Sequence, residues 1–406
     1  MKSSEYLSSD MLDESLLKSF APFRLVQMIL GSCRVDAKYR FVTSPTTLQR
    51  AYSVTCLLVV LICYSTILAH YFARYVAFPH IYYINFVSLF LHYATFACNV
   101  IHVRFVNNDS NVKFYIKMQE IDRKLNADHN KIFNDVLFKT NVMSVAATAL
   151  VSLLLYASAL SADAVVTASF AGPLVAQVTS TFEWLNCANL LIYFYIRIRY
   201  INAIITNHLR GTADLPVEEY TKNIFPTMKT LRCLASKTHD FKFSDTDVYL
   251  QDIFEQLLRF QSLYRFQMFL FCFKFFTATL LTFEFILLGL QHDIIKRFEF
   301  IVLPTVTAID LIIIVVICVR CEAFYREIKT TKYLCITVLS LIYSGPLRRK
   351  AIKMLKMIKE KPPQFSVYDM WRMDAATMIK MINLVTTLMV TILQFALLFY
   401  VWKIKK

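Results

Sequence analysis

Residues 382–402 read INLVTTLMVTILQFALLFYVW, a stretch without a single Asp, Glu, Lys or Arg. A bilayer core about 30 Å thick is crossed by about 20 apolar residues in an α-helix, so this stretch predicts a membrane-spanning helix. The whole chain has the same character, with 57% hydrophobic and 18% charged residues and a mean hydropathy of +0.47. A soluble domain carries about 25% charged residues, so this composition is typical of a membrane protein.

Six further stretches are long and apolar enough to span, which predicts an all-α protein with seven transmembrane helices. They are residues 53–73, 81–101, 142–162, 174–196, 266–288 and 300–319. A shorter apolar stretch at 333–343 cannot cross a bilayer, and we interpret it as a buried cytosolic helix.

The distribution of basic residues predicts the orientation. The N-terminal segment and the second, fourth and sixth connections carry 36 Lys and Arg, against 6 on the opposite side. Positive charge favours the cytosol, so we expect a cytosolic N-terminus and an extracellular C-terminus. A G-protein-coupled receptor has the reverse orientation, and the last span lacks Asn-Pro-x-x-Tyr, so a metabotropic receptor ranks last among the alternatives. The same distribution explains the net charge of +15 without a nucleic-acid partner.

No motif indicates an enzyme. H-E-x-x-H and G-x-S-x-G are absent, and five glycines in 406 residues argue against a glycine-rich nucleotide loop. The single C-x-x-C, Cys318 to Cys321, lacks the second pair of a zinc site, and we interpret it as buried thiols. We therefore expect no catalysis, no metal and no cofactor.

Polar residues form one stripe on the last span. At 3.6 residues per turn their spacings of 3, 4, 4 and 3 place them on one face; they are Lys380, Asn383, Thr387, Thr391 and Gln394. Such a stripe either joins helices or lines an aqueous pore, and the spacing alone does not decide between them. Phe395 lies beside the stripe, where it would supply a hydrophobic constriction or ordinary packing.

Charged and aromatic residues within the other spans predict an ion pair and a ligand pocket. Lys274 in the fifth span and Asp310 in the sixth fall at similar depth, so we predict a structural pair between them. A pocket for a small organic molecule needs aromatic walls and a few polar groups. Candidates at similar depth in the outer half are Tyr82, Tyr83, Tyr156, Gln177, Glu183, Trp184, Thr282, Glu284 and Thr305. Each of them could equally be part of the packed core.

Two connections have amphipathic helical patterns, FYIKMQEIDRKL after the second span and PLRRKAIKMLKMIKE after the sixth. In the second, Leu347, Ile352, Leu355, Met357 and Ile358 supply the apolar face. Such helices pack in a cytosolic anchor or attract anionic membrane lipids.

The C-terminal region resembles the signature of insect gustatory receptors, which is Thr-Tyr, five apolar residues and Gln-Phe in the last span. Here it is Thr387-Leu388, Met389 to Leu393, then Gln394-Phe395, with Leu388 at the usual Tyr position. Trp371 and Asp374 match an aromatic and an Asp before the span, and Asp369 occupies a usual Gly position.

The resemblance implies a ligand-gated cation channel of four identical or different gustatory receptor subunits in the plasma membrane. The last span of each subunit then lines the pore, with Thr387, Thr391, Gln394 and Phe395 as pore or gate residues. A small-molecule tastant binds between the outer halves of the other spans. The sequence shows no sugar or carbon-dioxide signature, so we favour a bitter or orphan receptor. A non-conducting accessory membrane protein with the same architecture is the alternative.

The predicted organisation has four parts. Residues 1–50 form a cytosolic N-terminal arm and 51–320 form six transmembrane helices with cytosolic extensions. Residues 321–375 form cytosolic anchor helices, and 376–406 form the pore-lining seventh helix with a short extracellular tail.

Overall fold

Among the described residues, seven helices are long and apolar enough to cross a membrane, which confirms the seven predicted spans. The structure is a computed structural model that describes residues 11–38, 40–124, 127–160, 164–212, 246–292 and 297–404. The seven are α2 (Thr47–Tyr75), α3 (Pro79–Ile101), α5 (Ala127–Ala159), α7 (Ala171–Thr212), α9 (Thr246–His292), α10 (Arg297–Leu341) and α12 (Ala375–Ile404). Residues 213–245, which are part of the predicted connection between the fourth and fifth spans, and both chain ends (1–10 and 405–406) lie outside the described residues.

Shorter elements complete the chain. They are the helices α1 (Glu14–Ile29), α4 (Asn108–Lys124), α6 (Ala164–Ser169) and α11 (Pro346–Glu360), the π-helix η1 (His102–Val106), and two antiparallel hairpins, β1 (Asp36–Lys38) with β2 (Phe41–Thr43) and β3 (Ser366–Val367) with β4 (Trp371–Arg372).

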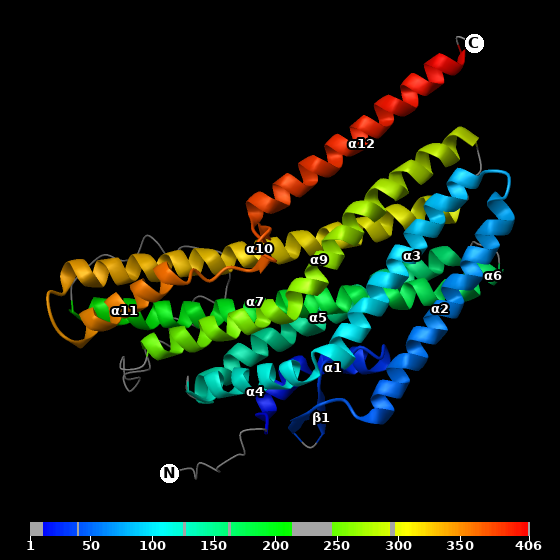
Figure 1. The fold of residues 1–406 in the computed structure, drawn as a ribbon. Helices are drawn as coiled ribbons and strands as arrows, with labels where there is room; N and C mark the ends of the chain where they lie inside the picture. The colour runs from blue at the N-terminus through cyan, green and yellow to red at the C-terminus, as the bar shows by residue number, and fades with distance from the viewer. Residues whose placement is uncertain are drawn as a thin grey trace.

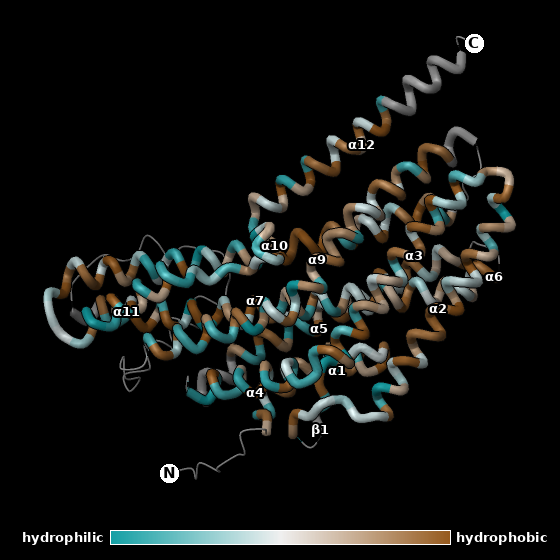
Figure 2. Tube along the Cα trace, in the orientation of Figure 1, coloured by the Kyte–Doolittle hydropathy of each residue, from teal (hydrophilic) through white to brown (hydrophobic). Residues whose placement is uncertain are grey.

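The helices form an elongated bundle (Figure 1) in which α10 packs along α7, α1 along α5 and α3 along α9. Hydrophobic residues are concentrated at the end that holds α2 and α3, and hydrophilic residues are denser toward α4 and α11 (Figure 2). The long helices thus run from a membrane-like section into a more polar one. The N-terminal segment is part of this body, because α1 packs along α5 rather than forming a separate arm.

Local sequence explains where key helices begin. At the start of α2, the Thr46 hydroxyl accepts a hydrogen bond from the Gln49 backbone (3.4 Å), and the Gln49 side chain accepts one from the Thr46 backbone (3.1 Å). This reciprocal cap satisfies two N–H groups that the first helical turn leaves free. Pro79 begins α3 and Pro346 begins α11, where a missing N–H costs no hydrogen bond.

The helix predicted at 333–343 is not a separate element. It is the end of α10, which runs without interruption from Arg297 to Leu341 and crosses the predicted boundary at 320/321. The chain contains no Gly or Pro between Pro304 and Gly345, so nothing in this stretch breaks the helix. Tyr333 is also 57% exposed, so the segment is not fully buried as expected.

Both predicted amphipathic segments form helices. In α4 the buried face contains Phe114, Met118 and Ile121, as the pattern predicts. In α11 the buried row is Leu347, Ala351, Met354 and Ile358. Ile352 is expected on the apolar face but is 47% exposed. The buried residues follow one another at spacings of 4, 3 and 4, and this periodicity places Ala351 rather than Ile352 on the face that packs on the bundle.

Candidate functional site: a cavity between the helices and a sparsely packed last helix

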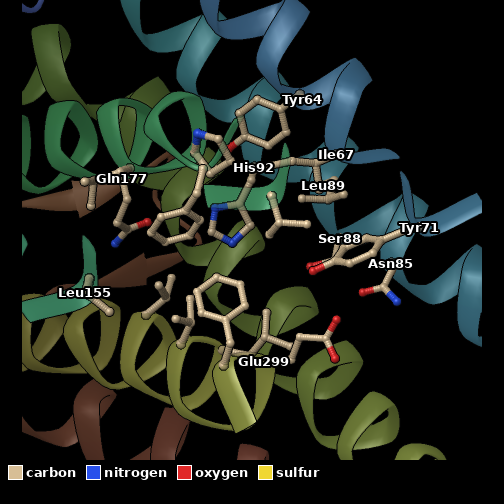
Figure 3. Close-up of a pocket in the computed structure, with 18 residues that line it drawn as sticks. Tyr64, Ile67, Tyr71, Asn85, Ser88, Leu89, His92, Leu155, Gln177 and Glu299 are labelled. Carbon is tan, nitrogen blue, oxygen red and sulfur yellow. The ribbon is translucent and has the colours of Figure 1, made fainter. Parts of the chain in front are cut away.

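A cavity of about 90 Å³ lies between α2, α3, α5, α6, α7 and α10 (Figure 3). Its walls are mainly apolar and include Ile67, Leu89, Leu155, Phe170, Phe298 and Val302. Polar groups enter at a few places, namely Tyr64, Tyr71, Asn85, Ser88, His92, Gln177 and Glu299. An apolar enclosure with a small number of polar groups is typical of a site for a small organic ligand.

One polar corner of the cavity belongs to a network of three side chains from three helices. Lys274 Nζ lies 2.9 Å from Asp310 Oδ2, and both side chains are 2% exposed. Gln177, which lines the cavity, donates to Asp310 Oδ1 (2.9 Å) and accepts from Lys274 Nζ (3.0 Å). The two charges that the sequence pairs are therefore in contact, and an amide exposed to the cavity joins them.

A second polar cluster includes Glu299, also on the cavity wall. Arg74 Nη1 lies 2.7 Å from Glu299 Oε1, and the Tyr75 hydroxyl lies 3.2 Å from each carboxylate oxygen. This pair is not predicted from the sequence, because Glu299 directly precedes the predicted sixth span. Arg74 did carry a signal, as the one basic residue between the first two spans.

Gln177 is the one predicted ligand residue that lines this cavity. Tyr83 is 62% exposed, Tyr156 is 36% exposed and Glu284 is exposed on the surface of α9. Tyr82 packs against Phe72, Thr282 is buried elsewhere, and the Thr305 hydroxyl donates to the Ile301 carbonyl (2.7 Å). The sequence predicts that these residues lie at a similar depth in the membrane. In the structure they lie on different faces of their helices, so their side chains do not meet in one cavity.

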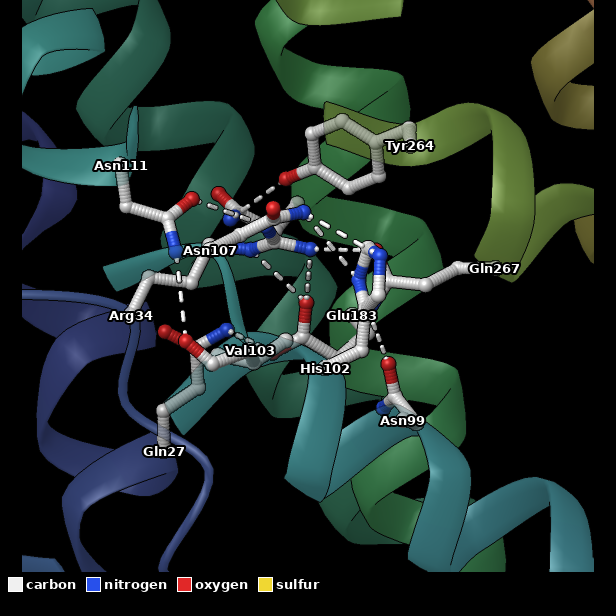
Figure 4. Close-up of polar contacts among 11 residues, drawn as sticks. Gln27, Arg34, Asn99, His102, Val103, Asn107, Asn111, Glu183, Tyr264 and Gln267 are labelled. Atoms are coloured by element: carbon white, nitrogen blue, oxygen red, sulfur yellow. Dashed lines mark hydrogen bonds and ion pairs between the residues drawn. The ribbon is translucent and has the colours of Figure 1, made fainter. Parts of the chain in front are cut away.

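Glu183 and Trp184 do not line this cavity, and Glu183 belongs to a separate polar network (Figure 4). Arg34, from the N-terminal segment, donates to Glu183 Oε2 through Nη2 (2.8 Å) and Nε (3.0 Å), and Gln27 donates to Oε1 (3.0 Å). The expectation that Glu183 faces a ligand is replaced by a buried ion pair with the chain's own N-terminal segment. Trp184 stacks on Phe271 at 4.8 Å and is part of the main core.

The Arg34 guanidinium continues this network across the bundle. Nη2 donates to Gln267 (2.9 Å) and Nη1 to Asn111 (3.2 Å), and Gln267 in turn donates to Asn99. The guanidinium also lies 4.1 Å from the ring centre of Tyr264. One buried cation thus connects the N-terminal segment with α3, α4, α7 and α9.

The last helix makes few contacts with the rest of the chain and leans away from the bundle (Figure 1). In its described part, Val385 is the one buried side chain. Met378, Met381 and Met389 pack beside it, where α12 meets α9 and α10. At about 100° per residue this row lies opposite the polar stripe.

The polar stripe therefore faces away from the rest of the protein. Asn383, Thr387 and Gln394 are exposed, and Thr391 is half-buried. The two threonine hydroxyls donate to carbonyls one turn earlier, Thr387 to Asn383 (2.8 Å) and Thr391 to Thr387 (2.8 Å). The side chain of Phe395 lies outside the described part of the structure.

The residues just before α12 have structural roles. Asp374 Oδ1 accepts from the Thr377 backbone (2.8 Å) and so caps the helix, while Oδ2 accepts from Arg372 Nε (2.9 Å). Partial burial raises the pKa of Asp374, but these hydrogen bonds outweigh it and hold the pKa below its usual value. Asp369, at the position where the signature has Gly, has φ +57°, which is the backbone region that favours Gly.

Comparisons with known proteins agree with this architecture. A family model described as 7tm chemosensory receptor matches residues 20–399. A solved structure of the insect olfactory receptor OR5 from Machilis hrabei, in complex with eugenol, superposes with a TM-score of 0.62 at 10% sequence identity. The match covers 94% of this chain and 100% of that chain. A search of curated protein sequences finds no match to this chain.

Proposed function

Because the chain belongs to the seven-transmembrane chemosensory receptor family, we propose that it is a taste receptor that acts as a ligand-gated, non-selective cation channel. In this proposal four subunits, identical or from different gustatory receptors, surround one pore in the plasma membrane. A small tastant of the bitter or orphan class opens the pore without chemical conversion. The N-terminus is cytosolic and the C-terminus extracellular.

The observation that carries this proposal is the position of the polar stripe on α12. Polar side chains in a membrane face protein or water rather than lipid. Within one subunit the stripe faces outward, opposite the row formed by Met378, Met381, Val385 and Met389. An arrangement of several subunits that directs these stripes at a common axis would give each of them an aqueous surface. The cavity between α2, α3, α5, α6, α7 and α10 would supply the ligand site.

The test combines current recording with cysteine accessibility. The channel is expressed alone and with candidate partner subunits, and currents are recorded across a panel of tastants. We expect Thr387→Cys and Thr391→Cys channels to change their current on treatment with a small water-soluble thiol reagent. Met389→Cys, on the packed face of the same helix, is the matched control and should change much less.

Two results would count against the proposal. Equal reactivity at all three positions would show that the stripe does not line a pore. A protein that reaches the cell surface but passes no current in any subunit combination would favour the non-conducting accessory protein.

A further inference from the structure

Tyr64 brings a buried hydroxyl to the cavity without a hydrogen-bond partner. The side chain is 5% exposed and lines the cavity on the same side as His92 (Figure 3). Among the described residues, none donates a hydrogen bond to the Tyr64 hydroxyl and none accepts one from it. A buried donor without a hydrogen-bond partner is unfavourable, so the site favours an occupant that accepts a hydrogen bond from Tyr64.

The position of this hydroxyl is fixed by packing between α2 and α3. The Tyr64 ring lies 5.7 Å from the ring of Tyr93, and both contact the apolar cluster around Val60, Phe96 and Val100. The Tyr93 hydroxyl reaches the Leu57 carbonyl (3.5 Å), outside the cavity. Tyr64 therefore presents its donor from a rigid wall, which favours discrimination between ligands.

The carboxylate that lines the cavity, Glu299, and the Lys274–Asp310 pair behind Gln177 are already neutralised by protein partners. Glu299 is paired with Arg74 at 2.7 Å and also accepts a hydrogen bond from the Tyr75 hydroxyl. Lys274 and Asp310 are paired with each other, and Gln177 is hydrogen-bonded to both. A charged ligand would lose its hydration here without gaining a free counter-charge, which is strongly unfavourable in an apolar enclosure.

We propose that the cavity selects a small, uncharged, mainly apolar molecule with one hydrogen-bond acceptor, such as a ketone, and that the Tyr64 hydroxyl donates to this acceptor. This inference rests on the proposed function only in taking the cavity as the ligand site. Tyr64 is then the residue that distinguishes a ketone from a hydrocarbon of the same shape. Water that occupies the site in the absence of ligand would be replaced by the carbonyl oxygen without loss of the hydrogen bond.

The test measures binding rather than current, so that its result does not depend on channel activity. Full-length protein in detergent is titrated with isosteric pairs in which C=CH₂ replaces C=O, and ligand-induced thermal stabilisation gives the affinity. The pairs are acetophenone with α-methylstyrene, and 2-heptanone with 2-methyl-1-heptene. Benzoate and benzylammonium serve as charged probes of similar size.

We expect the wild-type protein to bind at least one ketone about tenfold more tightly than its alkene, the size of one hydrogen bond. Tyr64→Phe should bind ketone and alkene equally, and its retained alkene binding shows that the variant is folded. Tyr93→Phe, the same change on the neighbouring ring outside the cavity, should keep the ketone preference. Neither charged probe should stabilise the protein.

Three results would overturn the inference. They are an undiminished ketone preference in Tyr64→Phe, no preference or no binding in the wild type, and stronger binding of a charged probe than of any ketone. The proposed function fails differently. If the ketone preference depends on Tyr64 but no ligand evokes a current, the proposed ligand site is supported and the proposed channel activity is contradicted.

Discussion

At the scale of single residues, the buried ion pair between Lys274 and Asp310 makes the protein sensitive to the loss of either partner. Removing one partner of a buried pair leaves an uncompensated charge, which costs about 3–5 kcal/mol. We therefore expect Asp310→Leu alone, and Lys274→Met alone, to reduce the amount of protein at the cell surface and to lower its melting temperature in detergent. The double variant should recover much of that loss, because neither charge remains.

Gln177 provides a further check on this double-mutant test, because it is hydrogen-bonded to both charged residues. With both charges removed, the Gln177 amide loses both of its hydrogen-bond partners, so the recovery should be incomplete. Adding Gln177→Leu to the double variant should raise the melting temperature further. Loss in the double variant equal to the sum of the two single losses would show instead that Lys274 and Asp310 act independently.

Asp374 gives a second prediction at this scale, because it caps the helix proposed to line the pore. Asp374→Ala should lower stability by about 1 kcal/mol, whereas Asp374→Asn keeps a capping oxygen and should lose less. The lowered pKa of Asp374 means that the charged form stabilises the fold. This contribution is complete above the unfolded-state pKa, about 3.9, and is lost as pH falls through the folded pKa. Thermal melts at neutral pH and near pH 3 measure it as a difference between wild type and Asp374→Asn.

At the scale of elements, the close contact between α2 and α7 depends on Gly172. A Cβ at Gly172 would lie 2.3 Å from Cys63 Cβ, so Gly172→Ala forces the two helices apart. Such overpacking costs about 1–3 kcal/mol, and it displaces the cavity wall at Pro173 and Leu174. We expect a lower melting temperature and weaker ligand binding.

Cys63→Gly provides the matched background for this prediction, because it removes the Cβ that Gly172→Ala would meet. In that background Gly172→Ala should no longer lower the melting temperature and should raise it slightly, since Ala is the better helix former. If Gly172→Ala is equally damaging with and without Cys63, contact between these two helices is not the cause.

The elements also show how far the sequence predicts this structure. Long apolar stretches with few charges predict the spans, because an α-helix of about 20 such residues satisfies all of its backbone hydrogen bonds internally in lipid. The pair of Lys274 and Asp310 could be placed because both lie in neighbouring helices joined by a short connection. Glu183 could not, because its partner Arg34 is 149 residues earlier in a segment with no transmembrane pattern. Depth along a helix is readable from sequence, but the face that a residue such as Tyr83 presents depends on packing between helices.

At the scale of the whole molecule, the charge asymmetry makes a prediction about orientation. An epitope attached after Lys406 should be stained on intact cells, whereas a tag before Met1 should be reached only after permeabilisation. The physical reason is the concentration of Lys and Arg on the side of the N-terminal segment. The reverse staining pattern would contradict both the orientation and the proposed channel. A surface marker that is stained in both conditions serves as the control.

The sparse packing of α12 also has a consequence for sensitivity. A helix with one buried side chain in its described part loses few contacts when it shifts, so two positions of α12 differ little in free energy within a subunit. A ligand moves an equilibrium only by its difference in affinity for the two states, and a tenfold difference is worth about 1.4 kcal/mol. In the proposed tetramer four such sites together supply about 5.5 kcal/mol, which converts a population of 1:99 into 99:1. Each cavity then needs only modest selectivity between the two states for the assembly to respond almost completely.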